Sequence, residues 1–261
     1  MPIGDIFSKL DELNVSTADD KEFKIKLTQI KKLGLRIIGV PHLGFRGRAS
    51  LILKFLNKIE KNDLVLDAGC GYGFYSLTLS KKWKEVYALD LEKERIDELN
   101  KIIKTRQEFS GIKTFEGSLT NLPFKNNFFG LILCSEVVEH IKDDKIAFSE
   151  LARVLKPNGY LILSFPTNSR NNKKEYKKFH HERPGYDRKA IEEIAGKNGL
   201  FVKEIKYYEY SLGNLLFRIH NRFSNLVLTA LFFYPFYALF RLDNIIKTGE
   251  PNGQVVLLQK K

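Results

Sequence analysis

The residues best placed to do chemistry stand where two predicted strands end. The apolar run at residues 64–67 ends in Asp67 and leads into a glycine-rich turn at residues 68–73. Such a turn lets the backbone approach a ligand and enter a helix directly, while a neighbouring carboxylate can accept hydrogen bonds from a cationic amine. Asp90 ends the next strand, 90 − 67 = 23 residues later, which is the spacing at which an acid reaches ribose hydroxyls. The pattern predicts a nucleoside ligand with a cationic tail.

The spacing of the glycines restricts the type of nucleoside ligand that the turn can bind. Gly69, Gly71 and Gly73 follow G-x-G-x-G rather than the G-x-G-x-x-G of dinucleotide sites. The carboxylate of Asp67 would repel a pyrophosphate, whereas it would accept hydrogen bonds from an ammonium group. The turn therefore disfavours a nicotinamide-dependent dehydrogenase.

The elements that position these acids alternate between strand and helix patterns. Continuous apolar runs, typical of strands buried on both faces, occupy residues 64–67, 85–90, 131–135 and 160–165, with a further strand near Phe115. Helical spacing is found at residues 75–82, 93–104 and 142–155. This alternation predicts an α/β protein with a doubly wound parallel sheet.

Two segments flank that core. Towards the N-terminus we predict a helix at residues 21–33, a loop at 39–48 and a helix at 49–58. Towards the C-terminus, Asp187 is a candidate N-cap for a helix ending before Gly199, followed by strands at 201–208 and 254–259 with an apolar stretch between them. We predict a helical cap at residues 1–60 and a ligand-binding domain at 61–261, with a helical insertion at about 209–250.

Four ordered motifs resemble those of the class I S-adenosylmethionine-dependent methyltransferases, particularly the small-molecule group that includes the quinone-type enzymes. They are VLDAGCGYG, ALDLE, GSLTNLPF with LILCSEVVEHI, and RVLKPNGYLILSFP, and they span roughly residues 60–170. The resemblance implies a Rossmann-like seven-stranded sheet with N-terminal helices and a helical insertion before the last strand. It also implies a transferase that uses S-adenosylmethionine for methylation.

The resemblance also assigns roles to the residues of the first two motifs. Asp67, with the backbone of Ala68, Gly69, Cys70 and Gly71, would hold the methionine part of S-adenosylmethionine. Asp90 would bind both ribose hydroxyls, and Leu91 would pack on the adenine.

The third motif would complete the cofactor site. Ser118 stands where the family usually has an acid that accepts the adenine amino group, so it departs from the pattern. Leu119 stands at the position of the apolar residue that stacks on the ring, and Ser135 is the last predicted cofactor-binding residue. Gly130, where Asp usually follows Phe, is a second departure that we interpret as structural.

Glu139 and His140 follow the fourth predicted strand, over the expected methyl group, and are the predicted catalytic residues. A neutral imidazole suits removal of a proton from an acceptor hydroxyl near pH 7. A helix-capping or substrate-shaping role for His140 remains an equal alternative.

The segment FHHERPGYD at residues 179–187 holds a second group of histidines. His180, His181 and Glu182 are consecutive and so are poorly arranged to converge on one ion; we predict no metal site. A polar lid is the better interpretation, with His181 and Arg183 facing the acceptor. The predicted loop at 39–48, with His42, Arg46 and Arg48, is a candidate for closing the cofactor pocket.

The apolar stretch at residues 226–240 would form a helix about 22 Å long, shorter than the roughly 30 Å hydrocarbon core of a bilayer, and Pro235 should interrupt it. We therefore expect no membrane span. Its basic flanks, Arg218, Arg222, Arg241 and Lys247, suit a helix lying at an anionic membrane surface. A cap over an apolar acceptor pocket, a buried helix and a homodimer contact are the alternatives.

Composition sets the remaining limits on the 261 residues. Lys and Arg number 43 against 31 Asp and Glu, a net charge of +12, and residues 170–261 carry 17 against 9, or +8 of that total. An anionic partner is favoured. Two cysteines are too few for a disulfide scaffold or zinc ribbon. With no secretory signal visible, we expect a cytoplasmic protein, peripheral at the inner membrane face if the apolar stretch meets lipid.

The sequence thus predicts a methyltransferase for a small or lipid-linked, apolar acceptor. The charge raises the alternative of an RNA-directed methyltransferase. However, residues 135–140 read SEVVEH rather than Asn/Asp-Pro-Pro-aromatic, and no Pro-Cys nucleophile motif is present, so a nucleic-acid partner is disfavoured. A non-catalytic protein that binds the cofactor is the alternative from a different class.

Overall fold

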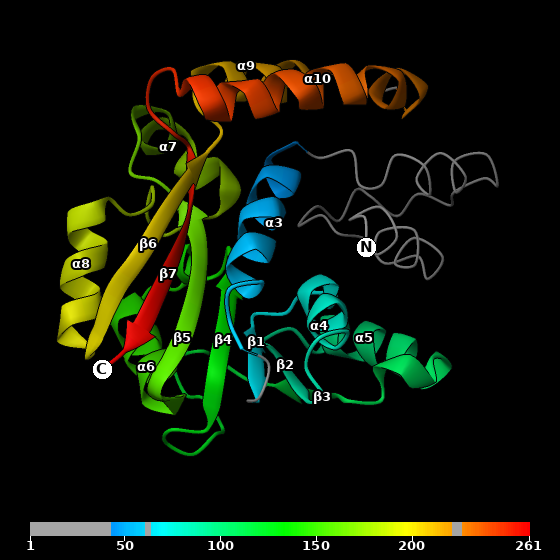
Figure 1. Ribbon diagram of the computed structural model, residues 1–261, viewed down its shortest axis with the longest axis vertical. Coiled ribbons are helices and arrows are strands. Elements are labelled where there is room, and N and C mark those ends of the chain that lie inside the picture. The colour runs from blue at the N-terminus through cyan, green and yellow to red at the C-terminus, as the bar shows by residue number, and fades with distance from the viewer. Residues whose placement is uncertain (1–42, 61–63, 221–225) are drawn as a thin grey trace. The chain divides into compact units, whose positions relative to one another are not determined.

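The computed structural model describes residues 43–60, 64–220 and 226–261, which include one seven-stranded sheet with flanking helices (Figure 1). The predicted helix at 21–33, and His42, lie outside the described residues. The strands are β1 (Val65–Ala68), β2 (Val86–Asp90), β3 (Ile112–Glu116), β4 (Phe129–Ser135), β5 (Leu155–Pro166), β6 (Leu200–Tyr208) and β7 (Gly253–Lys260). The α-helices are α3 (Leu43–Leu56), α4 (Phe74–Leu79), α5 (Lys93–Thr105), α6 (Asp144–Val154), α7 (Arg170–Glu175), α8 (Arg188–Lys197), α9 (Ser211–His220) and α10 (Leu226–Ile246). Short 3-10 helices are η2 (Gln107–Phe109), η3 (Val138–His140) and η4 (Tyr176–Phe179).

The strand order is β3-β2-β1-β4-β5-β7-β6. The neighbouring pairs among β3, β2, β1, β4 and β5 are parallel, whereas β7 is antiparallel to both β5 and β6. The predicted seven-stranded sheet of the methyltransferase type, with a helical insertion before the last strand, is confirmed; the sheet is mixed because β7 lies between β5 and β6 and runs antiparallel to both. Because parallel strands end at the same edge, Asp67 on β1 and Asp90 on β2 are brought to one side of the sheet.

Both faces of the sheet are buried, which explains the continuous apolar runs. Successive side chains of a strand point to opposite faces, so Leu66 and Ala68 face the same way as Ile132 and Cys134, and all four belong to one core cluster. That cluster includes Phe148 and Leu151 of α6 and Ile191 of α8. The alternate positions on the other face are also fully buried, among them Val65, Leu131, Leu133 and Ile162.

The N-terminal boundary of α3 differs from the prediction. Residues 39–48 were expected to form a loop, but α3 begins at Leu43 and continues to Leu56. Burial of Leu43, Arg46 and Ala49 continues the helical spacing of Ile52 and Leu56, and this tertiary burial outweighs the low helix propensity of the glycines in the segment.

The two ends of α8 agree with the helix boundaries predicted from the sequence. Asp187 caps α8 and its carboxylate accepts a hydrogen bond from the backbone N–H of Ala190 at 2.8 Å. Gly199 then adopts a left-handed conformation with φ +67°, as expected for a residue that ends a helix. Both signals were local and both were predicted.

The described residues divide into two compact units. One contains Leu43 to Gly47 and residues 209–249, and the other contains Arg48–Tyr208 and Glu250–Lys261. The predicted insertion at about 209–250 overlaps the first unit, and the predicted cap at 1–60 lies largely outside the described residues; the predicted domain boundaries stay predictions.

Within the insertion, α10 runs through Pro235 for 21 residues, so the expected interruption is wrong. An interior proline removes one backbone hydrogen bond of the helix, and close packing against α9 offsets that loss. A Cβ atom on Gly213 of α9 would lie 2.5 Å from the Asp243 carboxylate of α10, and the Gly213 N–H donates to that carboxylate at 2.8 Å. Among the described residues, no helix is both long and apolar enough to cross a membrane.

Candidate active site

The glycine-rich turn after β1 adopts a conformation that most side chains disfavour. Gly69 has φ +76° and Gly71 φ +54°, in the left-handed region that glycine enters without strain. The backbone N–H groups of Gly69 and Cys70 donate to the carbonyl oxygen of Leu89 at 2.7 and 2.9 Å. A Cβ atom on Gly69 would stand 2.4 Å from Val137 Cγ2, so this turn packs against the segment that follows β4.

Asp67, the acid that ends the first apolar run, is 1% exposed. Burial, with a further contribution from the Asp90 charge, raises the pKa of its carboxyl group to about 7, although a hydrogen bond from Ser76 acts in the opposite direction. That bond joins Ser76 Oγ to Asp67 Oδ2 at 2.5 Å. Sequence reasoning missed Ser76, whose signal is a small polar residue in the first turn of the short helix α4.

Asp90 connects the ends of β1, β2 and β3. Its carboxylate accepts hydrogen bonds from the backbone N–H of Gly71 at 2.8 Å and of Glu92 at 3.0 Å. Its carbonyl oxygen accepts from Gly117 N–H at 2.9 Å. The next side chain, Leu91, is 70% exposed, so an apolar surface is available beside a carboxylate, the combination that a nucleoside needs.

The remaining predicted cofactor residues have different surroundings. Ser118 Oγ lies 2.8 Å from Thr120 Oγ1 in the loop after β3, and Leu119 is buried in the core cluster. Ser135 ends β4 and shares a 2.8 Å hydrogen bond with Ser164 Oγ. Thus Ala68, Ser118, Leu119 and Ser135 all stand at or just beyond the carboxyl ends of neighbouring strands, as the resemblance implies; their contacts with a cofactor stay predictions.

Cys70 and Cys134 are buried and free. Burial raises the pKa of both thiols well above the usual range, so neither is activated as a nucleophile. This agrees with a structural role for both.

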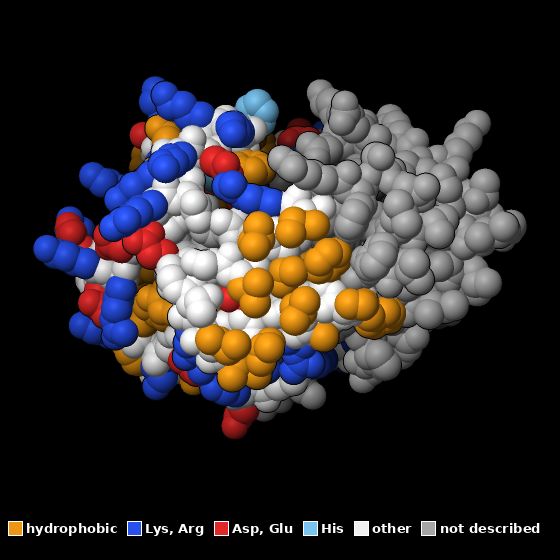
Figure 2. Space-filling model, turned by 90° about the horizontal axis from the view of Figure 1, so that it is seen from above, with side chains coloured by type: hydrophobic (Ala, Val, Ile, Leu, Met, Phe, Trp, Pro, Cys, Tyr) orange, Lys and Arg blue, Asp and Glu red, His pale blue; other side chains and the backbone are white. Residues whose placement is uncertain are grey.

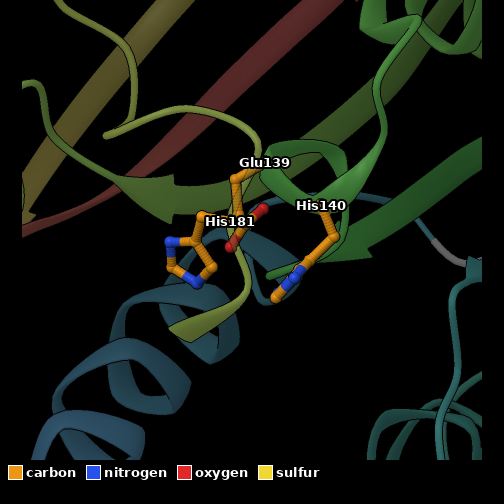
Figure 3. Close-up of side chains that lie close together, drawn as sticks. All are labelled: Glu139, His140 and His181. Atoms are coloured by element: carbon orange, nitrogen blue, oxygen red, sulfur yellow. The ribbon is translucent and has the colours of Figure 1, made fainter. Parts of the chain in front are cut away.

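Glu139 and His140, the predicted catalytic residues, form the end of η3 directly after β4. The structure brings His181 to them from the loop that follows η4, and their side chains point toward a common region (Figure 3). One donor atom from each of the three residues lies within 4.8 Å of the others. The adjacent His180 and Glu182 are not members of this cluster.

Arg183 holds the loop on η3, which revises its predicted orientation toward the acceptor. Its guanidinium donates to the carbonyl oxygens of Val138 and Ile141, both at 2.8 Å, and lies 3.3 Å from the Asp144 carboxylate. Tyr186 also donates to Asp144, at 2.7 Å. Arg183 is thus used to position the loop that carries His181.

The two arginines predicted to close the cofactor pocket belong to α3 instead of a loop. Arg48 forms a 3.0 Å ion pair with Glu136, a residue with φ +56° just after β4. Arg46 stacks over the ring of Phe233 at 4.4 Å. Glu136 is a further polar residue beside the strand ends that sequence reasoning did not single out.

Comparison with known proteins identifies the domain that contains this site. Residues 66–163 match the family described as "Methyltransferase domain", and these residues include the glycine turn, both acids and η3. This part of the chain is a class I S-adenosylmethionine-dependent methyltransferase domain. An uncharacterized protein of Methanocaldococcus jannaschii is 40% identical over 114 residues, which cover 43% of this chain and 44% of that protein.

Other methyltransferases share the same part of the chain. Demethylmenaquinone methyltransferase of Lactiplantibacillus plantarum is 29% identical over 107 residues, covering 40% of this chain and 45% of that enzyme. The crystal structure of geranyl diphosphate C-methyltransferase from Streptomyces coelicolor, a complex that includes S-adenosyl-L-homocysteine, has the same fold. Its TM-score is 0.63 at 16% identity, and the match covers 83% of the chain described above and 76% of that enzyme. The alignments span less than half the length of the first curated relatives.

Proposed function

We propose that this methyltransferase transfers the methyl group of S-adenosylmethionine to a small or lipid-linked, apolar acceptor. The use of S-adenosylmethionine is supported by the arrangement of the two acids at the ends of β1 and β2. Asp90 accepts a hydrogen bond from the Gly71 N–H at 2.8 Å, and the buried Asp67 directly precedes the glycine turn. A carboxylate in a buried site gains from a cationic ligand, and the amino group of the methionine moiety supplies one. Asp90 bonds to the ribose hydroxyls, and Leu91 packs on the adenine.

Methyl transfer does not require the protein to form a covalent intermediate. A sulfonium is already an activated methyl donor, so the site has to align the acceptor with the methyl group and exclude water. Val137 lies against Gly69 of the cofactor turn, and Glu139 and His140 follow two and three residues later. This short connection supports an acceptor site formed by Glu139 and His140.

The apolar nature of the acceptor is supported by the insertion. Figure 2 shows apolar side chains gathered on the face presented by α9 and α10, and the large exposed ones are Leu215, Ile219, Tyr234, Leu239, Leu242, Ile245 and Ile246. Arg218, Arg241 and Lys247 are exposed on or just after the same helices, whereas Arg222 lies outside the described residues. An apolar face with basic residues suits an anionic lipid surface, and the name of the demethylmenaquinone relative points to an apolar acceptor.

Calorimetry with S-adenosylmethionine and S-adenosyl-L-homocysteine tests the cofactor assignment. We expect binding of either ligand in the micromolar range by the wild-type chain, and Asp90→Ala should weaken it by at least tenfold, because each charge-assisted hydrogen bond contributes roughly 1.5–3 kcal/mol. Asp143→Ala, which removes an acid from the loop before α6, is the matched control and should bind as wild type. Equal affinities of Asp90→Ala and wild type would remove the ribose assignment.

Mass spectrometry of small molecules that copurify with the chain would then identify the acceptor class. A hydrophobic molecule with a free hydroxyl, amine or activated carbon is the expected finding. Methylation of RNA instead of such a molecule would contradict the proposed acceptor but not the cofactor.

A further inference from the structure

We infer that Glu139, His140 and His181 together bind a divalent transition-metal ion, contrary to the absence of metal expected from the sequence. Two imidazoles and one carboxylate form a ligand set suited to first-row transition ions, and the same types of ligand occur in catalytic zinc sites that keep a position open. The fold brings these side chains together, because Glu139 and His181 are 181 − 139 = 42 residues apart in the chain.

The three side chains are within easy reach of one ion. Their donor atoms lie within 4.8 Å of one another, and donors about 2.1 Å from a shared ion stand about 3–4 Å apart. Small side-chain rotations therefore close the site. The rings of His140 and His181 already stand edge to face with centroids 4.5 Å apart.

Backbone hydrogen bonds fix the two segments that carry the ligands. Glu182 N–H donates to the Glu139 carbonyl oxygen at 2.9 Å, which joins the loop that carries His181 to η3. Arg183 bridges the same two segments through Val138 and Ile141. Ligands held in this way need little reorganisation when an ion binds.

The orientation of His140 also suits coordination. Its Nδ1 lies 3.2 Å from the carbonyl oxygen of His180, and because a carbonyl only accepts hydrogen bonds, Nδ1 carries the proton that is donated. The lone pair of a neutral imidazole is then on Nε2. Histidines that bind metals commonly donate their other ring N–H to a backbone carbonyl or carboxylate in this manner.

The three side chains of the cluster differ in their exposure to solvent. Glu139 is fully buried, His181 is partly exposed and His140 is exposed. A cation beside a buried carboxylate stabilises the charge there, while the exposed side leaves room for a further ligand. The ion would therefore be anchored by the buried carboxylate and open on its solvent-exposed side.

This inference rests on the proposed function for its chemical role, and it narrows the acceptor to a molecule with a hydroxyl group. An acceptor hydroxyl bound to the ion is more acidic and loses its proton to a base in solvent. An oxygen lone pair then forms the O–CH3 bond as the S–CH3 bond breaks, and the electron pair of that bond stays on sulfur to give S-adenosyl-L-homocysteine. His140 is in this case an ion ligand and does not itself remove the proton.

Zinc titration of the tag-free full chain, first stripped with a chelator, tests the site independently of turnover. We expect one equivalent of Zn²⁺ by calorimetry and by elemental analysis, and at least a tenfold loss of affinity in His181→Ala. His180→Asn is the matched control, because it changes the adjacent histidine outside the cluster and Asn tolerates its left-handed backbone; it should bind zinc as wild type.

Absence of stoichiometric zinc in the wild type, or equal affinity in His181→Ala, would overturn the inference. Because His181 is partly exposed, this variant should remain folded, which circular dichroism verifies; Glu139→Gln provides a second loss of one ligand. Titration of the same samples with S-adenosyl-L-homocysteine separates the two proposals. Zinc binding without cofactor binding would contradict the proposed function alone, and cofactor binding without zinc would contradict the metal site alone.

Discussion

Asp67 has a protonation equilibrium on which folding depends, and on which we expect cofactor binding to depend. The pKa of its buried carboxyl group is raised from 3.8 to about 7, so between these values the native protein keeps a proton that the unfolded chain has released. Stability contributed by this proton is present below about pH 4 and falls as pH rises to about 7. A bound ammonium group reverses the preference, because it stabilises the carboxylate.

Replacing Asp67 with Asn should therefore remove a pH dependence. Between pH 5.5 and 8 the ligand-free wild type should lose about 2 kcal/mol of unfolding free energy through this group, and Asp67→Asn should show a correspondingly smaller loss. Urea denaturation at the two pH values measures the difference. Identical pH dependence in the two proteins would show that Asp67 is ionised throughout this range.

The cofactor affinity of the wild type should change with pH in the opposite sense to its stability. Wild-type affinity for S-adenosylmethionine should rise from pH 6 to 8 as Asp67 loses its proton, whereas Asp67→Asn should bind weakly at both pH values. Calorimetry at fixed ionic strength measures both. A variant that binds as tightly as wild type at pH 8 would exclude contact between Asp67 and the cationic group.

His140 is expected to act on the acceptor and not on the cofactor. His140→Ala should lower turnover by about 10²-fold, whether the imidazole holds an ion or contacts the acceptor itself, while S-adenosyl-L-homocysteine affinity stays nearly unchanged. Steady-state kinetics on the acceptor and calorimetry measure these quantities. Turnover within twofold of wild type would remove His140 from the reaction.

Among the elements, α9 and α10 form a pair held at its base by one buried carboxylate. Asp243 accepts the Gly213 N–H in the first turn of α9 at 2.8 Å and also accepts the Thr248 hydroxyl at 3.3 Å, which satisfies a helix N-terminus that would otherwise lack an acceptor. The buried sides of α10 include Phe233 and Phe240. The outer apolar side chains are thus not needed for packing within the pair.

The outer face provides the membrane test. Leu239→Asp with Leu242→Asp should abolish flotation with anionic vesicles while preserving cofactor binding, and salt should weaken wild-type flotation by screening the basic residues. Ile146→Asp, at a site on α6 with 50% exposure, is a control that should float as wild type. Wild-type protein that stays unbound at low salt would exclude the lipid surface and favour a pocket cover or a homodimer contact.

At the scale of the whole molecule, the methyltransferase motif residues and the cluster of Glu139, His140 and His181 belong to one compact unit, while α9 and α10 belong to the other. Cofactor binding should consequently stabilise the sheet-containing unit. The positive charge of the chain, concentrated in residues 170–261, affects encounter with anionic partners and not the choice of fold.

Thermal unfolding tests which cofactor stabilises this unit. S-adenosyl-L-homocysteine at 100 times its dissociation constant should contribute about 2.7 kcal/mol and raise the midpoint by about 5–10 °C. NADH at the same concentration should leave the midpoint unchanged. Stabilisation by NADH alone would contradict assignment to the methyltransferases.

The sequence by itself determined the strands, the glycine turn and the two acids, because buried parallel strands and left-handed turns leave local patterns in Leu64 to Gly73 and in Val86 to Asp90. The helical start of α3 and the continuation of α10 through Pro235 depended on packing that outweighs local preference. Only the tertiary structure decided that the side chain of His181, and not those of its neighbours, lies with the side chains of Glu139 and His140. Contacts between distant loops arise from hydrogen bonds such as those of Arg183 with η3, which have no periodic signature in the chain.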